Sequence, residues 1–312
     1  MRAFLFPGQG SQAVGMGAAL SEASSAARDV FAEVDEALGQ NLFRLMKEGP
    51  EDELKLTENA QPAIMAHSMA VFAALTREGG VDLAKAAQFV AGHSLGEYSA
   101  LCAAGSFDLP TTAKLLKLRG QAMQAAVPVG QGAMCALLGA DLAMARRIAE
   151  AAAQGEVCAV ANDNDPSQVV LSGNKGAIDR AVEMAKEMGA KRAVPLPVSA
   201  PFHCPLMQPA AEAMSDALSY TVVEAPAVPV LANVTAKAES DPDTIRSLLV
   251  DQVTGMVRWR ESVANMAEAG VEEFVELGGK VLGAMVKRIA PDAKVTSVVT
   301  IDDIEALAKE IA

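Results

Sequence analysis

The chain has 312 residues, of which 51% are hydrophobic and 21% charged, so it can bury one large core and a smaller lobe. Its formal net charge of −13 argues against nucleic acids and anionic membranes as partners, because binding to phosphates needs clustered lysine and arginine. An aromatic content of only 4%, together with alanine-rich stretches, favours an α-rich α/β protein.

The cysteines and the N-terminus bear on the cellular compartment. The cysteines are far apart, without a C-x-x-C pair, which fits neither a disulfide framework nor a zinc site: Cys102, Cys135, Cys158 and Cys204. The apolar run at the N-terminus is broken by Pro7 and Gly8, too early for a signal peptide, and no uncharged run approaches a membrane span. We therefore expect a cytoplasmic protein with reduced thiols and no metal.

The first part of the chain alternates apolar strands and helical patterns. A short buried strand is expected at 3–6, followed by the loop Pro7 to Gln12, and a second strand at 88–91 leads directly into Gly92. Patterns typical of helices occupy 24–37, 62–78, 97–104 and 110–126. A strand that ends in a glycine-rich loop is often the binding edge of a sheet.

Between residues 127 and 199 the pattern changes to the order βαββαβ, which is the ferredoxin-like arrangement. Strands are expected at 133–138, 157–161, 168–172 and 192–196, and helices at 142–153 and 178–188. Strand and helix patterns resume from Pro205 onwards. We interpret 127–199 as a small lobe inserted into a large α/β-hydrolase-like lobe with a short parallel sheet, formed by 1–126 and 200–312.

The clearest chemical signal is the G-x-S-x-G run from Gly92 to Gly96, between an apolar strand and a helical pattern. Here the glycines permit a sharp turn that exposes the Ser94 hydroxyl at a helix N-terminus, where the helix dipole favours negative charge. The alternative is an ordinary strand-to-helix turn with Ser94 as the N-cap residue.

A serine hydroxyl needs a base, and the chain has three histidines. His93 follows the tight turn and is expected to point away from the hydroxyl, so we assign it to packing or positioning. His67 lies in a helical pattern among methionines and is expected to be structural. His203 lies in a loop that prolines stiffen and apolar residues surround, so it is the candidate base, although a surface histidine is the alternative.

Arg119 lies on an apolar face of the helix expected at 110–126. A solvated guanidinium at the helix rim is one interpretation, since the stem can cover apolar surface. If the head points inward it needs an anion, and the sequence offers no evident partner. A substrate carboxylate bound by two parallel hydrogen bonds would satisfy it.

These motifs together resemble the malonyl-CoA:acyl carrier protein transacylases and the related acyltransferase domains of polyketide and fatty acid synthases. The matching segments occur in the expected order and are Phe6-Pro7-Gly8-Gln9-Gly10-Ser11-Gln12, Gly92-His93-Ser94-Leu95-Gly96-Glu97-Tyr98, Leu118-Arg119-Gly120 and Pro201-Phe202-His203. The resemblance covers essentially the whole chain. It implies two-step transfer of a malonyl group to the thiol of acyl carrier protein, with malonyl-CoA as substrate and no cofactor.

The resemblance also implies roles for individual residues. Ser94 would be the acylated nucleophile and His203 its base, with the imidazole held by the backbone carbonyl of Gln252. The oxyanion hole would be formed by the N–H groups of Gln9 and Leu95.

Arg119 would bind the malonyl carboxylate, and His93 and Asn162 would lie near the substrate, although an asparagine in so polar a turn can be structural. Phe202 would crowd the α-carbon and disfavour a methyl branch, the alternative being a plain core residue.

The partner is expected to be acidic, so docking should use local basic pairs, for which Lys191-Arg192 and Lys287-Arg288 are candidates. Such pairs are ordinary solvated surface in most proteins. We expect a monomer. Two other classes compete with the acyltransferase: a serine hydrolase, in which water replaces the thiol, and a scaffold that has kept the fold without catalysis.

Overall fold

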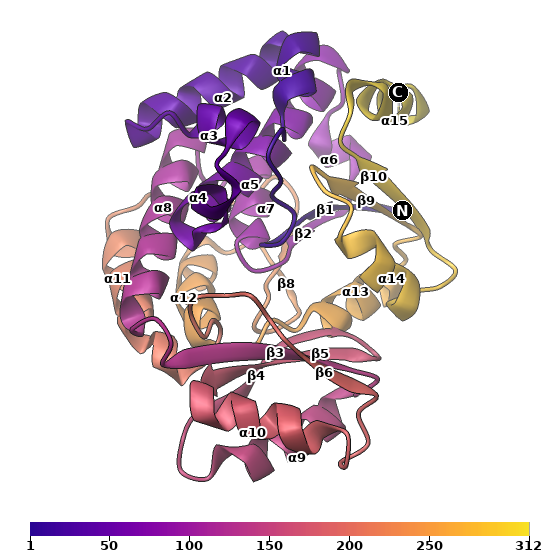
Figure 1. Ribbon diagram of the computed structural model, residues 1–312. Coiled ribbons are helices and arrows are strands. Elements are labelled where there is room, and N and C mark those ends of the chain that lie inside the picture. Colours follow the sequence, from indigo (N-terminus) through magenta and orange to yellow (C-terminus); the bar gives the residue numbers. More distant parts are fainter. Residues whose placement is uncertain (312) are drawn as a thin grey trace.

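The computed structural model describes residues 1–311, which form two lobes, each built around its own sheet (Figure 1). In the large lobe the strand order is β10-β9-β1-β2-β7-β8, and neighbours are parallel except for β8, which pairs antiparallel with β7 at one edge. The strands are β1 Arg2–Phe6, β2 Phe89–Gly92, β7 Val230–Leu231, β8 Ala238–Glu239, β9 Glu273–Leu277 and β10 Lys294–Val298. The expected short parallel sheet is confirmed, with an antiparallel edge strand added.

Helices cover both faces of this sheet, because its strands are apolar on both sides. In β1, Phe4 and Phe6 enter the larger core, whereas Ala3 and Leu5 enter a second core beneath α13 Trp259–Glu268 and α14 Leu282–Ile289. The other helices of the large lobe are α1 Ala18–Ala23, α2 Ser25–Leu38, α3 Leu42–Glu48, α4 Glu51–Lys55, α5 Thr57–Ala73 with the π-helix Ala74–Glu78, α6 Leu83–Ala86, α7 Gly96–Ala103, α8 Leu109–Ala126, the 3-10 turn Pro205–Met207, α11 Gln208–Ser219, α12 Pro242–Thr254 and α15 Ile301–Ile311.

The small lobe is an antiparallel sheet with helices on one face and a hydrophobic core of its own. Its strands, in the spatial order β4-β5-β3-β6, are β3 Gly132–Leu138, β4 Cys158–Asp165, β5 Gln168–Asn174 and β6 Arg192–Pro195, and its helices are α9 Leu142–Ala153 and α10 Lys175–Ala185. Figure 1 shows both helices on the side of the sheet away from the large lobe. The expected βαββαβ order is confirmed, and the exact lobe boundaries at 127 and 199 stay a prediction.

Several elements differ from the expected bounds by one to three residues, and two differ by more. Strand β4 continues to Asp165 instead of ending at 161, because residues 162–165 pair with β5. Val257 of the large lobe adds an isolated bridge: its N–H donates to Ala161 O at 2.8 Å, and the Asp163 N–H donates to Val257 O at 2.9 Å. The polar residues 162–164 are therefore in a strand, and the expected turn was wrong. Helix α5 begins at Thr57, so Pro62 lies inside it.

Two ion pairs next to this bridge also join the lobes. Arg260 of α13 approaches Asp163 at 2.8 Å, and Arg288 of α14 approaches Asp165 at 2.7 Å. Both carboxylates are buried, with 1% and 0% of their side-chain surface exposed. Because an unpaired buried charge is costly, these pairs favour the observed arrangement of the lobes.

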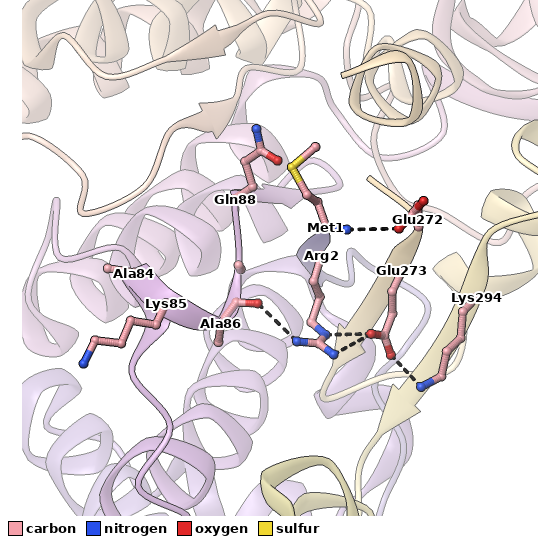
Figure 2. A pocket seen from close by; sticks show the side chains of 10 residues that line it. Met1, Arg2, Ala84, Lys85, Ala86, Gln88, Glu272, Glu273 and Lys294 are labelled. Atoms are coloured by element: carbon pink, nitrogen blue, oxygen red, sulfur yellow. Dashed lines mark hydrogen bonds and ion pairs between the residues drawn. The ribbon is translucent and has the colours of Figure 1, made fainter. Parts of the chain in front are cut away.

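The two ends of the large sheet differ in character. At the end where β1, β9 and β10 begin, Figure 2 shows a shallow pocket in which charged side chains pair with one another. Arg2 binds Glu273 at 2.6 Å, and Glu273 also accepts from Lys294 at 3.0 Å. The opposite end, where β1 and β2 finish, faces the small lobe and carries the residues that sequence analysis selected. Within residues 1–311 no helix is both long and apolar enough to span a membrane.

Replacing Arg260 with methionine should destabilise the protein, because Asp163 would stay buried without its cation. We expect a loss of about 2 kcal/mol, less than the 3 to 5 typical of a fully buried pair since Arg260 is partly exposed. Urea denaturation at neutral pH measures this change in the free energy of unfolding. The control is Arg44→Met, which breaks a pair with side chains 71% and 58% exposed and should cost less than about 1 kcal/mol. Equal losses in both variants would contradict the role assigned to the buried pair.

Candidate active site

Ser94 occupies a sharp turn between β2 and α7, and its φ of 54° places it in the left-handed region. A Cβ on Gly92 would lie 1.9 Å from the backbone of Gly96, and one on Gly96 would lie 2.3 Å from Phe6 O, so both positions require glycine. Asn233, just after β7, spans the turn: its Oδ1 accepts from the Ser94 N–H at 2.8 Å and its Nδ2 donates to Gly92 O at 2.7 Å. The expected elbow is present, and it exposes the hydroxyl.

The Ser94 hydroxyl meets the ring of His203, with 2.7 Å between Oγ and Nε2. On the other side of the ring, Nδ1 lies 2.9 Å from the backbone carbonyl of Gln252, which can only accept, so Nδ1 carries a proton and Nε2 is free to accept one. Burial, helped by the positive charge of Arg119, lowers the pKa of His203 to about 3. A neutral imidazole in this position can take the hydroxyl proton.

Arg119, on α8, points inward and is 1% exposed, so a solvated guanidinium at the rim is excluded. It donates to Gln61 Oε1 at 2.7 Å, to Gln252 Oε1 at 2.8 Å and to Ser94 Oγ at 3.2 Å. Its Nε has no hydrogen-bond partner among the described residues. Amide oxygens satisfy only part of the guanidinium, and no carboxylate of residues 1–311 contacts it.

A cavity of about 380 Å³ lies between the two lobes, and Ser94, His203 and Arg119 all line it. The other expected site residues that line it are Gln9, Leu95, His93, Asn162 and Phe202. The small lobe and the segment that follows it add the apolar side chains of Met134, Leu196, Pro197 and Val198. Gln252 stands apart from the cavity wall, behind Arg119 and His203, so direct contact of its side chain with a substrate is not supported.

The loop before Ser94 packs closely on the turn. A Cβ on Gly8 would lie 2.7 Å from His93 O, so this glycine brings the neighbouring Gln9 against the elbow. Within residues 1–311 the backbone N–H groups of Gln9 and Leu95 donate to no other group of the protein. Two free donors beside a hydroxyl can stabilise an oxyanion.

His93 and Asn164 connect the elbow with the small lobe. His93 Nε2 lies 2.8 Å from Asn164 Oδ1 in β4, and its ring centroid is 5.6 Å from that of Trp259. These contacts agree with the packing or positioning role expected for His93.

His67 is buried and its Nδ1 lies 3.0 Å from Gly278 O, in agreement with a structural role.

Sequence reasoning missed three polar residues of the site. Gln61 accepts a hydrogen bond from Arg119, and Asn233 bonds to the Ser94 turn. Glu97, which is 3% exposed, accepts from the Asn233 N–H at 3.1 Å and from Gln252 Nε2 at 2.7 Å. Burial raises the pKa of Glu97 to about 7. The one available signal was an acidic residue inside an otherwise apolar helix just after the G-x-S-x-G run.

Comparison with known proteins agrees with this geometry. Residues 3–297 match the acyl transferase domain family. The chain is 45% identical over 288 residues to the malonyl CoA-acyl carrier protein transacylase of Escherichia coli strain K12, covering 92% of each chain.

Two solved structures share the whole fold. The acyl-carrier-protein-S-malonyltransferase of Bartonella henselae is 53% identical with a TM-score of 0.97, covering 99% of each chain. A malonyl-transacylase in complex with its type II polyketide synthase acyl carrier protein is 40% identical with a TM-score of 0.95, again over 99% of each chain. The chain therefore belongs to the acyl transferase family.

Proposed function

We propose that this protein transfers the malonyl group of malonyl-CoA to the phosphopantetheine thiol of acyl carrier protein, and so supplies extender units for fatty acid or polyketide synthesis. The observation that carries the proposal is that a Ser-His pair and a buried arginine without a contacting carboxylate face one cavity. The names of the relatives support the same substrate and acceptor.

In the first half-reaction His203 Nε2 takes the proton of Ser94 Oγ as the oxygen attacks the thioester carbonyl. The carbonyl oxygen becomes an oxyanion near the N–H groups of Gln9 and Leu95. When the carbon–sulfur bond breaks, the proton passes from His203 to the sulfur of CoA. The carrier thiol then reverses these steps on the acyl-serine, so the reaction needs no metal or redox cofactor.

Arg119 determines which acyl group fits. Arg119 lines the cavity and its Nη2 reaches Ser94 Oγ at 3.2 Å, so a malonyl carboxylate beside Ser94 would supply the missing anion. Phe202 and Asn162 line the same cavity. A ring close to the α-carbon would disfavour a methyl branch, a discrimination of roughly 10- to 200-fold for one methyl group.

The proposed acyl-enzyme can be detected by its mass. Intact-protein mass after mixing with malonyl-CoA should show one added malonyl group, and Ser94→Ala should show none, because Oγ is the attacking atom. Failure of the unaltered protein to gain this mass would favour a scaffold without catalysis. A serine hydrolase would instead lose the thioester without any added thiol acceptor, so the rate with and without acyl carrier protein separates the two enzymes.

Arg119→Ala should reduce malonyl transfer far more than acetyl transfer, because only the malonyl group has a carboxylate. The expected loss of discrimination is about 2 to 5 kcal/mol, as for a desolvated charge pair that loses one partner. The measurement is kcat/KM for both acyl-CoA substrates. Some loss of acetyl transfer is expected as well, since Arg119 also contacts Ser94 Oγ. Equal losses for the two substrates would remove the carboxylate-binding role.

Of the basic pairs suggested for docking, Lys191-Arg192 lies at one end of the small sheet. Lys287-Arg288 lies on α14 of the large lobe, and its Arg288 binds Asp165 at that same end of the small sheet. Across it, Asp165 pairs with Gln168, Gln168 with Leu138 and Leu138 with Arg192. Three strand spacings separate Arg192 from Asp165, roughly 14 Å. Because Arg288 binds Asp165, both pairs border one surface, which supports this surface as the docking site for an acidic carrier.

Reversing charge at Lys191 and Arg192 together should raise the KM for acyl carrier protein about tenfold and leave acylation by malonyl-CoA unchanged. Arg288 is unsuitable for this test, since its replacement also breaks the ion pair with Asp165. Lys85→Glu, an 85% exposed position at the far end of the large sheet in Figure 2, serves as the control. A KM that does not change would exclude Lys191 and Arg192 from docking.

The cysteines bear on the cellular compartment in which the reaction takes place. The four cysteines are free thiols, in agreement with a reducing compartment, and we propose that the enzyme acts in the cytoplasm as a monomer. One chain supplies every residue used in the steps above, so the proposed mechanism needs no second copy.

A further inference from the structure

Glu97 is a buried carboxylate directly behind the active site. It lies in the first turn of α7, three residues after Ser94, and is 3% exposed. Two N–H donors converge on one of its oxygens, since Oε2 accepts from the Asn233 backbone at 3.1 Å and from Gln252 Nε2 at 2.7 Å. The proposed transfer mechanism uses neither this carboxylate nor the Gln252 side chain.

The Gln252 amide links Glu97 to Arg119. Its Oε1 accepts from Arg119 Nη2 at 2.8 Å, and its Nε2 donates to Glu97 and also to Ser94 O at 3.0 Å. This orientation of the amide is the only one compatible with both neighbours, because a guanidinium can only donate and an ionised carboxylate can only accept. Glu97 thus fixes the amide, and the amide presents its oxygen to Arg119.

The charges around Glu97 determine whether its carboxyl group is ionised. The titratable groups around the network are Arg119 from α8, Tyr98 beside Glu97, His67 from α5, and His93 and His203 from the loops. Burial lowers the pKa of all three histidines and raises that of Tyr98, so these groups are uncharged near neutral pH. Lys55 also lines the cavity, but its side chain is 58% exposed and pairs with Glu51 at 2.8 Å. The buried network therefore holds one cation, Arg119, and one titratable carboxyl group, Glu97.

A second carboxylate changes this balance. Once a malonyl group binds Arg119, an ionised Glu97 would leave two buried negative charges and one positive charge, which is unfavourable at low dielectric. A proton on Glu97 restores neutrality. The free oxygen for it is Oε1, because Oε2 already accepts two hydrogen bonds.

We infer that Glu97 is a positioning residue for Arg119 that balances its charge in the free enzyme and takes up a proton from solvent when a carboxylated acyl group binds. The inference rests on the proposed malonyl transfer. Because burial has already raised the pKa of Glu97 to about 7, a bound carboxylate has only to raise it further. Carboxylate binding should then weaken as pH rises, since ionisation of Glu97 opposes it.

Proton uptake during acylation tests this directly. Acylation by a thioester is proton-neutral near pH 7.5, since the serine proton ends on the CoA thiol. A pH-indicator dye in weak buffer should report uptake of roughly 0.5 to 1 proton per malonylated enzyme, and none for acetyl-CoA. Intact-protein mass on the same samples gives the acylated fraction. Absence of malonyl mass would overturn the proposed function and this inference together, whereas malonylation without proton uptake would overturn this inference alone.

Glu97→Gln is the informative variant, because an amide oxygen at Oε2 keeps both hydrogen bonds while the charge is lost. Its malonylation should show no proton uptake, and retained uptake would assign the proton to another group. Glu276→Gln is the control for the loss of a buried carboxylate elsewhere. Glu276 accepts from the backbone N–H groups of Val281 and Gly283, of which a glutamine can keep one, and uptake per malonylated enzyme should stay as in the unaltered enzyme.

A steady-state measurement on the unaltered enzyme gives an independent result that does not depend on how a variant folds. The ratio of kcat/KM for malonyl-CoA over acetyl-CoA should fall about fivefold or more between pH 6.5 and 9. In Glu97→Gln the ratio should be flat over this range. A flat ratio in the unaltered enzyme would overturn the inference.

Discussion

The burial of Arg119 without a contacting carboxylate is the constraint on which the site depends. A guanidinium cannot lose its charge at ordinary pH, so it must be compensated where it lies. Gln61 and Gln252 supply amide oxygens, and Glu97 supplies a carboxylate one amide further away. Arg119 still lacks a contacting anion, and a ligand in the cavity next to Ser94 Oγ can supply one. Substrate selection and the nucleophile are thus coupled through a single side chain.

The sequence predicted what local pattern and short motifs can encode. The parallel sheet, the ferredoxin-like order and the Ser94 turn follow from apolar periodicity and from glycines that only a tight turn requires. The pairing of Ser94 with His203 followed from elimination among few histidines. The link from His203 to the Gln252 carbonyl came from family resemblance alone, because a backbone acceptor leaves no trace in residue type. Catalytic roles for these residues stay predictions until they are tested in solution.

What the sequence could not predict depends on contacts between distant segments. Arg119 on an apolar helix face was compatible with a solvated rim, but α8 packs against α5, and Gln61 of α5 and Gln252 of α12 accept hydrogen bonds from the guanidinium. Residues 162–164 have the composition of a turn, yet they pair with β5 and with Val257, far along the chain, as part of β4. Arg288 appeared to be free for docking, whereas Asp165 in the other lobe already binds it. In each case a tertiary partner outweighed the local preference.

The extension of β4 has a consequence for the site as a whole. Register shifts at 160–162 and at 163–165 interrupt the regular alternation of its side chains. Asp163 and Asp165 bind arginines of the large lobe, whereas Asn162 lines the cavity and Asn164 holds His93 at the base of the elbow. One strand therefore joins the lobes and shapes the site. Because the ion pairs fix the position of the strand, they also fix how far Asn162 reaches into the cavity. Ion pairs that take no part in the proposed reaction therefore set the separation of the lobes and, with it, the space for an acyl group.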